Sequence, residues 1–398
     1  MTEIVRILKD LVAFNTVSDQ PPVDAIAYLK GFLAPLGFSF LTEDAGGFES
    51  LVARNEAALA WRGDGRYLAF CAHIDTVPVD RSLWTTDPFA LEERDGKCYG
   101  VGTSDMKGSL ACMLASLGEV SRSRPDLPLA LVVTHHEETA LEGARALVRS
   151  RAARAALRPM QLIIGEPTGL SIGYAHKGVL DFTVTIEGRS SHSGTPHRGL
   201  NALYGATAIL EAGARLDAEW RETRHPAFDS GNTVNVGTLR GGDVRNRVPG
   251  RAILSGDMRI VPGSSAALLV DEIEHQFSLL EVRGYACRLD RDFEASPFAM
   301  PADSGLIADL RRSTGAPLIT LNYATDAAVF QGEAGLDCAI FGPGDIRVCH
   351  MPDEYIETRE LANGAALYTK MLLAQRCAVA EEDPVDAVGA DAWPLEEI

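Results

Sequence analysis

The sequence has few of the features that mark membrane, secreted or nucleic-acid-binding proteins. No apolar run approaches the ~20 residues needed to cross a bilayer. Residues 1–6 contain no basic segment leading into an apolar block, so we predict no signal peptide and expect a cytoplasmic protein with no membrane partner. Lys and Arg number 37 against 55 Asp and Glu, for a net charge of −18. Without a basic surface to replace phosphate counterions, no nucleic-acid partner is expected.

Cysteines suited to metal binding are also absent. The seven cysteines are scattered along the chain and never spaced as Cys-X-X-Cys. Their pattern and odd number argue against a disulfide framework and against a zinc site built from thiolates. Cys71 and Cys349 lie close to candidate metal ligands, but small buried side chains are the simpler interpretation. A zinc or cobalt site in this chain would therefore use imidazole and carboxylate groups.

Acidic residues are concentrated near the C-terminal end. Residues 377–398 contain seven acids and no Lys or Arg, so we predict a solvated, poorly ordered tail there. The remainder of the chain is acidic as well. That charge would attract a cationic substrate, or it would serve solubility alone, and the sequence does not separate these two roles.

The 398 residues are too many for one ordinary core, and their patterning changes along the chain. In the first part, short apolar runs alternate with helical spacing, which predicts buried parallel strands with helices between them. The predicted strands are 67–71, 129–133 and 162–164, and the predicted helices are 5–12, 25–33, 108–120 and 141–149. Such alternation gives an α/β domain with a mostly parallel, covered central sheet.

The middle of the chain follows a different pattern. Polar and apolar residues alternate, as in half-exposed antiparallel strands, at 181–187, 233–237 and 251–259, and helices are predicted at 201–216 and 266–280. We therefore predict an inserted α+β domain over residues 173–288. It interrupts a catalytic domain made of residues 1–172 and 289–376, which ends in a helix at 360–375.

Three of the predicted parallel strands are each followed by a candidate metal ligand. These ligands are His73, Glu138 and Glu166, and side chains beyond the carboxyl ends of such strands meet at one rim of the sheet. Asp105, in a glycine-flanked loop, and His350, in a turn before the last helix, would join them. A shared carboxylate holds two divalent cations ~3.5–4 Å apart. The five residues together predict a paired-metal site, although each alone has an ordinary structural interpretation.

Two further acids stand beside these ligands. Asp75 lies two residues after His73, and in an extended segment it would point the same way and orient the imidazole. Glu137 and Glu138 are adjacent, so one is expected to bind metal and the other to take a proton from water. Taken alone, Asp75 is a capping residue and the acid pair is the solvated first turn of a helix. The two histidines before Glu137 have no partner at helical spacing and are not predicted as ligands.

Several segments together resemble the M20 metallopeptidase family in order and spacing, over about residues 1–376. They are Cys71–Pro78 (CAHIDTVP), Tyr99–Gly108 (YGVGTSDMKG), Glu137–Glu138, Gly165–Thr168 (GEPT) and His350–Glu354 (HMPDE). Residues 341–346 (FGPGDI) are similar to the acetylornithine deacetylase branch of that family, and the succinyl-diaminopimelate desuccinylases are similar as well.

The resemblance implies how the metals would be held. His73 and Glu166 would complete one metal site, Glu138 and His350 would complete the other, and Asp105 would bridge the two ions. Two divalent cations are expected as cofactors, Zn²⁺ first and Co²⁺ as the alternative.

The resemblance also implies the catalytic residues and an oligomeric state. Asp75 would orient His73, and Glu137 would act as general base and then general acid. Residues 190–196 (SSHSGTP) are similar to a family motif of the inserted domain, whose histidine reaches the partner subunit's site. This implies a homodimer formed through the inserted lid domain, with His192 stabilising the oxyanion across the interface. On the residues alone, His192 is an exposed loop histidine.

Substrate contacts are implied at the inserted domain. Residues 241–249, which include Asn246, and Arg259 resemble family positions that contact substrate. On the residues alone, Asn246 is equally a turn residue and Arg259 a surface ion pair. Arg259 or Lys177 is a natural partner for a substrate carboxylate.

The activity that the resemblance implies is hydrolysis of a small N-acyl amino acid, with N-acetylornithine, from arginine biosynthesis, as the first expected substrate. A desuccinylase, an aminoacylase and a carboxypeptidase-like dipeptidase are the alternatives. A non-catalytic homologue would have lost Glu137 or a ligand, and this sequence retains them all. A phosphate loop at 100–108 is set aside because the GKS/T ending is missing.

Overall fold

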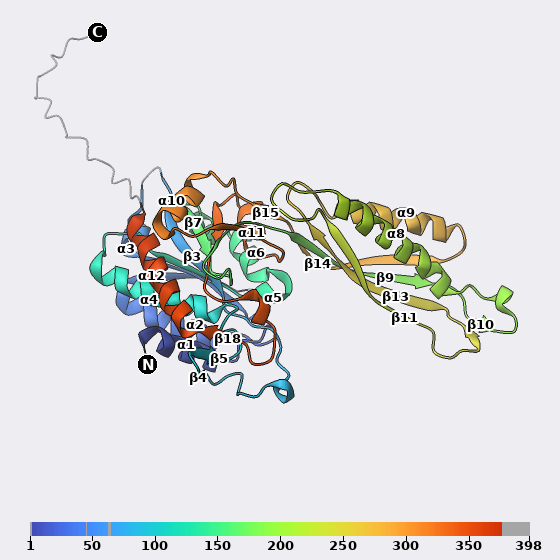
Figure 1. The fold of residues 1–398 in the computed structure, drawn as a ribbon, viewed down its shortest axis with the longest axis horizontal. Helices are drawn as coiled ribbons and strands as arrows, with labels where there is room; N and C mark the ends of the chain where they lie inside the picture. Colours follow the sequence, from blue (N-terminus) through green and yellow to red (C-terminus); the bar gives the residue numbers. More distant parts are fainter. Residues whose placement is uncertain (1, 45, 63–64, 376–398) are drawn as a thin grey trace, which may run out of the picture.

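The computed structural model describes residues 2–44, 46–62 and 65–375, which form two units side by side (Figure 1). The larger unit is built on a nine-stranded sheet, and the smaller unit on a four-stranded antiparallel sheet that projects to one side. This mixed α/β architecture confirms the predicted fold class. The predicted acidic tail at 377–398 lies outside the described residues. Across the described ranges, no helix is long and apolar enough to cross a membrane.

The large sheet has parallel strands at its centre and antiparallel pairs towards its edges. Its order is β1-β2-β6-β3-β7-β17-β8-β15, with β16 paired to β8. The strands span Phe38–Asp44 (β1), Glu49–Asn55 (β2), Tyr67–His73 (β3), Ala130–Thr134 (β6), Met160–Ile164 (β7), Ile172–His176 (β8), Phe298–Ala299 (β15), Leu318–Leu321 (β16) and Cys338–Ile340 (β17). Every residue of β3, β6 and β17 is buried, which explains their continuous apolar runs.

Two groups of helices pack on this sheet. One consists of α1 (Glu3–Ala13), α4 (Lys107–Ser123) and α12 (Thr358–Ala374), and the other of α6 (Glu142–Arg149), α7 (Arg151–Leu157) and α11 (Ala327–Gly332). Helix α1 shows why such a segment forms a helix and packs on the sheet. Its buried residues recur at helical spacing, and the Thr2 hydroxyl accepts the N–H of Val5 at its start.

Shorter elements complete the larger unit. The helices are α2 (Val23–Leu33), α3 (Glu56–Ala60), α5 (Glu137–Ala140) and α10 (Gly305–Thr314). A small three-stranded sheet is formed by β4 (Glu92–Arg94), β5 (Lys97–Tyr99) and β18 (Tyr355–Glu357). The short helix α5 is the element that begins with the predicted acid pair.

The smaller unit has its own apolar core. Its sheet order is β11-β13-β9-β14, with strands at Gly178–Glu187 (β9), Thr233–Gly241 (β11), Arg251–Ile260 (β13) and Ala286–Ala295 (β14). Helices α8 (Ala202–Glu222) and α9 (Ala267–Glu281) lie on one side of this sheet (Figure 1). Apolar residues of β9 and β13 point to the helices and form the core, which explains the alternating pattern.

The strands show where the chain passes from one sheet to the other. β8 belongs to the large sheet and β9 to the small one, so the chain crosses over at Lys177. It returns between β14 and β15, at residues 296–297. We propose these two crossings as the limits of the inserted domain, a few residues beyond the predicted limits of 173 and 288.

The parallel strands deliver polar residues to one edge of the large sheet. β3 lies between β6 and β7, with His73 opposite Thr134 and Cys71 opposite Ile164. The residues that follow these strands, including Glu137, Glu138 and Glu166, therefore emerge at the same carboxyl edge.

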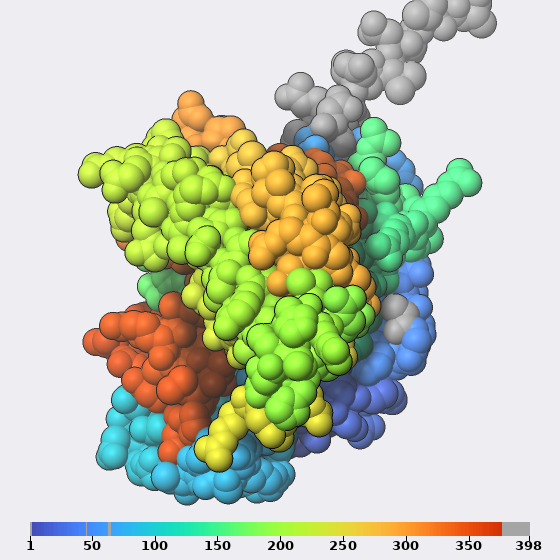
Figure 2. All heavy atoms as spheres, turned by 90° about the vertical axis from the view of Figure 1, so that its right-hand side faces the viewer, coloured from blue at the N-terminus to red at the C-terminus, as the bar shows by residue number. Residues whose placement is uncertain are grey.

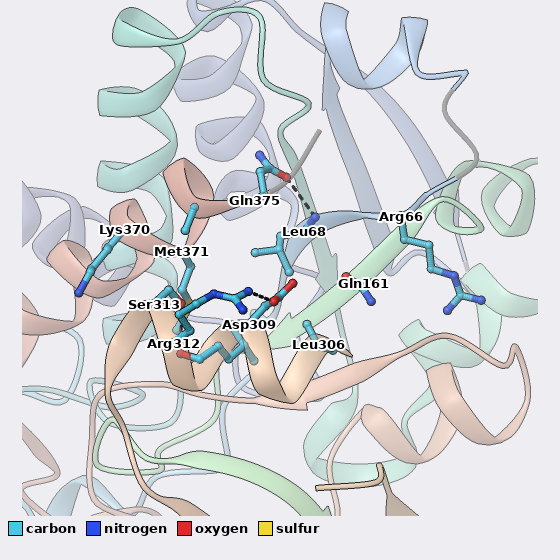
Figure 3. Close-up of a pocket in the computed structure, with 12 residues that line it drawn as sticks. Arg66, Leu68, Gln161, Leu306, Asp309, Arg312, Ser313, Lys370, Met371 and Gln375 are labelled. Atoms are coloured by element: carbon cyan, nitrogen blue, oxygen red, sulfur yellow. Dashed lines mark hydrogen bonds and ion pairs between the residues drawn. The ribbon is translucent and has the colours of Figure 1, made fainter. Parts of the chain in front are cut away.

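The opposite edge of the sheet carries a cavity of about 330 Å³ that holds none of the candidate ligands (Figure 3). Arg66, just before β3, and Gln161, at the start of β7, line it. The main-chain N–H of Leu68 donates to the Gln375 side chain there, which fastens the end of α12 to β3. This cavity therefore lies apart from the predicted chemistry.

Gly342→Ala is expected to destabilise the chain. A Cβ at Gly342 would lie 2.3 Å from the carbonyl oxygen of Gly165 and 2.6 Å from that of Glu166. Such crowding costs about 1–3 kcal/mol, and it would be measured as a lower urea midpoint. Gly31→Ala is the matched control, because nothing lies within 4 Å of its Cβ and Ala favours a helix interior by about 0.5–1 kcal/mol. An unchanged midpoint for Gly342→Ala would contradict this account of the contact.

Candidate metal centre

The five predicted metal ligands meet in one place, with Asp105 in the middle. His73 Nε2 lies 3.0 Å from Asp105 Oδ1 and 3.7 Å from Glu166 Oε1. His350 Nε2 lies 3.0 Å from Glu138 Oε1 and 3.5 Å from Asp105 Oδ2. The two oxygens of Asp105 therefore face two separate pairs, each made of one imidazole and one glutamate.

Separate segments of the larger unit deliver these side chains. His73 ends β3, Glu166 follows β7, and Glu138 lies on α5 after β6. Asp105 comes from the loop before α4, and His350 from the turn after a short 3₁₀ helix at Ile346–Val348. The convergence is the one expected at the carboxyl edge of an open α/β sheet.

The loop that carries Asp105 is fixed by a buried acid, Glu354. Its carboxylate accepts the main-chain N–H groups of Gly102 (3.0 Å), Ser104 (2.8 Å) and Asp105 (3.0 Å). Burial, followed by the charge of Asp105, raises the pKa of Glu354 to about 8. From the sequence, Glu354 belongs to a motif but has no predicted role, because its partners are main-chain groups rather than side chains.

Asp75 positions both His73 and the acid pair. His73 Nδ1 lies 3.0 Å from the main-chain oxygen of Asp75 and 3.6 Å from its carboxylate. A proton on Nδ1 leaves the Nε2 lone pair directed at Asp105. The Asp75 carboxylate also accepts the N–H groups of Glu137 (3.2 Å) and Glu138 (3.3 Å). The structure thus adds a contact with the α5 turn to the predicted role as orienter of the imidazole.

Backbone strain is concentrated around the same residues. His136 and His350 have φ angles of 52° and 62°, in the left-handed region that residues with a Cβ rarely occupy. His136 immediately precedes the acid pair, and His350 is itself a candidate ligand. Strained backbone of this kind persists where the surrounding structure over-determines it, and it is common at functional sites.

The site concentrates negative charge away from water. Burial, followed by neighbouring carboxylates, raises the pKa values of Glu137, Glu138 and Glu166. Burial also acts to raise the pKa of Asp105, but hydrogen bonds with His350 and His73 outweigh it and keep that pKa below its ordinary value. The hydrogen bond between His350 and Asp105, followed by the one between His350 and Glu138, raises the pKa of His350 to about 10.

The donor set fits divalent cations. Oε1 of Glu166 is buried without a hydrogen-bond partner among the described residues, and no Lys or Arg in the described ranges forms an ion pair with these acids. Potential ligand atoms of His73, Asp105 and Glu138, and of His73, Glu137 and Glu166, lie within 4.8 Å of one another. Imidazole and carboxylate donors without thiolate suit zinc and related first-row metals.

Asp326 is a buried acid near the site that the sequence analysis missed. Its Oδ2 accepts the hydroxyl of Thr134 at 2.6 Å, at the end of β6. Burial raises the pKa of Asp326 to about 6. Its contact is formed between residues 192 positions apart, and no local motif marks it.

His192 and Asn246 lie together, at the far end of the smaller unit. β10 (Ser191–His192) pairs there with β12 (Arg247–Val248). This end of the smaller unit lies at the right of Figure 1 and faces the viewer in Figure 2. Both residues are exposed, and the N–H of Ser193 donates to the main-chain oxygen of Asn246 at 3.1 Å. The structure does not bring His192 to the metal ligands of its own chain, because the length of the smaller unit separates them (Figure 1).

The two predicted substrate cations have different surroundings. Lys177 is buried, and its ammonium donates to the Ser230 hydroxyl (3.0 Å) and to the Gly231 carbonyl (3.2 Å). Arg259 pairs with Asp257 at 2.9 Å and lines a cavity of about 700 Å³ that begins at Pro167, next to Glu166. Of the two, Arg259 faces a space adjoining the site.

Comparison with known proteins agrees with the predicted family. A protein from Proteus mirabilis (strain HI4320) named acetylornithine deacetylase is 34% identical over 378 residues, which cover 90% of this chain and 94% of the relative. This identity, over nearly the full length of both chains, shows common descent.

Solved structures share the fold. An M20 family metallo-carboxypeptidase from Sulfolobus solfataricus has a TM-score of 0.74 and 18% identity, over 94% of this chain and 99% of that one. A dinuclear metal binding peptidase of the M20 family from Bacillus subtilis has a TM-score of 0.63 and 15% identity, over 93% and 96%. The model for peptidase family M20/M25/M40 matches residues 69–374, which include every candidate ligand. The chain therefore belongs to peptidase family M20/M25/M40.

Proposed function

We propose that this hydrolase cleaves the amide bond of an N-acyl amino acid at a centre of two divalent cations, with N-acetylornithine as its principal substrate. The observation that carries the proposal is the position of Asp105 between two imidazole–glutamate pairs. Its Oδ1 lies 3.0 Å from Nε2 of His73, and its Oδ2 lies 3.5 Å from Nε2 of His350. The name of the Proteus mirabilis relative supports the choice of substrate.

Each imidazole–glutamate pair would hold one cation. His73 and Glu166 form one pair, His350 and Glu138 form the other, and Asp105 would contribute one oxygen to each site. The donor atoms favour Zn²⁺, with Co²⁺ as the alternative. When bound, the two cations would acidify a water molecule and polarise the acyl carbonyl.

Glu137 is the residue placed to move the proton. Its carboxylate lies in the same cluster as His73 and Glu166, and its raised pKa suits a group that must accept and then release a proton. Glu137 takes a proton from the attacking water as the new C–O bond forms. It then gives that proton to the amine nitrogen as the C–N bond breaks.

His192 is suited to act on the site of a second copy of the chain. Its Nδ1 accepts the N–H of Gly194 at 3.0 Å, so the proton of a neutral imidazole is on Nε2. That N–H is exposed and would donate to an oxyanion, which stabilises a transition state by ~3–4 kcal/mol. Because His192 lies far from its own metal ligands (Figure 1), this role requires a homodimer.

The charged cavity beside Glu166 suits the amino-acid part of the substrate. Arg259 would pair with the α-carboxylate, while Lys177 is engaged by Ser230 and Gly231 instead. The same cavity contains the acids Asp345 and Glu360. They are the natural partners of an ammonium group such as that of ornithine.

Glu137→Gln is expected to lower kcat by about 10²–10⁴-fold, because proton transfer is lost, while the metal content stays normal. Purified protein loaded with Zn²⁺ or Co²⁺ would be assayed against N-acetyl, N-formyl and N-succinyl amino acids, with metal measured by mass spectrometry. Glu142→Gln, on the neighbouring helix, is the matched control and should keep full activity. Normal turnover by Glu137→Gln would refute its role.

The bridging position of Asp105 predicts different metal stoichiometries for two variants. Asp105→Asn is expected to lose both ions, because both share this carboxylate, whereas His350→Ala is expected to lose one. Equilibrium dialysis followed by elemental analysis would measure the ions retained per chain. Equal losses in the two variants would contradict a bridge, and full retention by Asp105→Asn would contradict the site itself.

A shared site predicts complementation between two inactive variants. Mixed dimers of His192→Ala and Glu137→Gln would contain one intact site, so co-expression should restore about a quarter of wild-type activity if the subunits pair at random. The control is co-expression of His192→Ala with the double variant that carries both His192→Ala and Glu137→Gln. Mixed dimers of these two chains have no intact site. Absence of rescue in isolated mixed dimers would place His192 outside the partner's site.

A further inference from the structure

A second cavity adjoins the metal centre on the side of His350. It encloses about 190 Å³, and His350 is part of its wall. Its apolar lining comes from the segment after β3, from the loop before Asp105 and from the residue after His350: Val77, Val79, Leu83, Trp84, Val101 and Met351. This volume is several times the ~30 Å³ of one water molecule, so the cavity has room for a short chain of carbon atoms.

Two large apolar side chains that line the cavity are exposed to solvent. Leu83 is 61% exposed and Met351 is 56% exposed, although both flank the site. Apolar groups gathered beside a polar site commonly mark the place where an apolar part of a ligand binds.

The charged groups in the lining are already engaged. The carboxylate of Asp80 accepts the N–H and hydroxyl of Ser82, and the carboxylate of Glu354 is held by the Asp105 loop. No Lys or Arg is among the described residues that line the cavity. A carboxylate entering this space would lose its hydration without gaining a Lys or Arg partner from the described lining residues.

The two cavities lie near different ligands: His350 lines one, and Pro167, next to Glu166, lines the other. The cavity beside Glu166 contains Arg259, Arg347, Asp345 and Glu360, whereas no Lys or Arg is among the described lining residues of the cavity beside His350. The two linings match the two parts of an N-acyl amino acid, a charged amino-acid part and an uncharged acyl chain.

We infer that the cavity beside His350 is the acyl-chain subsite, and that it selects short unbranched alkanoyl groups over acyl groups that carry a carboxylate. This inference rests on the proposed amide hydrolysis and makes its acyl group specific. Leu83 and Trp84 contribute to the selection because they form the apolar wall. A succinyl group is disfavoured because the described lining offers its carboxylate no Lys or Arg, and the imidazole of His350 is already paired with Glu138.

The first experiment varies the acyl chain on the amino acid that is hydrolysed best. Acetyl is the acyl group of the proposed natural substrate, and in the N-propionyl and N-butyryl analogues each further methylene that the cavity buries is expected to raise kcat/KM about 3- to 4-fold. The N-succinyl derivative is expected to fall at least ~10-fold below N-butyryl. Hydrolysis with no preference for longer chains, or with succinyl preferred, would overturn the subsite and leave the proposed function intact.

The second experiment changes the wall of the cavity. Leu83→Lys removes apolar surface and supplies a cation, so the butyryl-to-succinyl ratio of kcat/KM is expected to fall at least ~10-fold. Leu59→Lys, at an exposed leucine on α3, is the matched control and should leave that ratio unchanged. A ratio is insensitive to the fraction of folded or metal-loaded protein. An unchanged ratio in Leu83→Lys would overturn the assignment.

The third experiment needs no turnover. Titration of chelator-treated protein with butanamide is expected to give a saturable change in tryptophan fluorescence that Trp84→Phe abolishes and succinamate does not produce. Leu83→Lys should weaken butanamide binding at least ~5-fold, because it adds a charge to the cavity wall and removes apolar contacts. Leu59→Lys should leave butanamide binding unchanged. If no N-acyl amino acid is hydrolysed, the proposed function fails, and this titration still tests the cavity. Absence of a Trp84-dependent signal would overturn it.

Discussion

The crowding of acidic groups around Asp105 is the constraint on which the rest of the structure depends. Glu138 and Glu166 lie on either side of it, and burial and mutual repulsion raise the pKa values of both. Within the described residues, only imidazoles pair with these acids. Buried, unpaired charge is costly, and cations would remove that cost. Metal binding therefore has free energy to contribute to folding as well as to chemistry, because ligand binding to the native state alone stabilises it.

Two buried acids, Glu354 and Asp75, hold the ligand loops in place through main-chain hydrogen bonds rather than through ion pairs. Glu354 accepts three main-chain N–H groups around Asp105, and the Asp75 carboxylate accepts those of Glu137 and Glu138. Bonds of this kind fix the backbone from which a ligand projects and leave its carboxylate free. Burial acts to raise the pKa of Asp75, but hydrogen bonds with His73 and Ser18 hold that pKa below its ordinary value, so Asp75 is an ionised acceptor, which strengthens each of its bonds about twofold relative to a neutral acceptor. The loops are thereby organised before any cation arrives, which is the arrangement that catalysis by electrostatic stabilisation requires.

The sequence predicted those parts of the site that follow from strand geometry. Strands β3, β6 and β7 were recognisable as apolar runs, and their shared carboxyl edge was enough to bring His73, Glu138 and Glu166 together. The role of Glu354 was not predictable, because main-chain N–H groups leave no side-chain pattern. Nor was the antiparallel pair β1 and β2, because neither strand alternates regularly: β1 is mostly exposed or half-buried, and β2 is mostly buried. The surroundings of Lys177 were not predictable either, because its ammonium contacts Ser230 and Gly231, more than 50 residues along the chain.

The position of His192 connects the fold to the proposed assembly. Within one chain, the length of the smaller unit keeps β10 away from the rim that carries Asp105 (Figure 1). The strands of the small sheet run the length of the unit and keep β10 at its tip. A second copy can carry the same tip to the site, since an interface with two-fold symmetry presents the same surface to each subunit. In the proposed dimer, the inserted unit would add a donor to the partner's site, while the larger unit supplies the acids and both cavities. The metal ligands and Glu137 would then come from one chain and the oxyanion donor from the other.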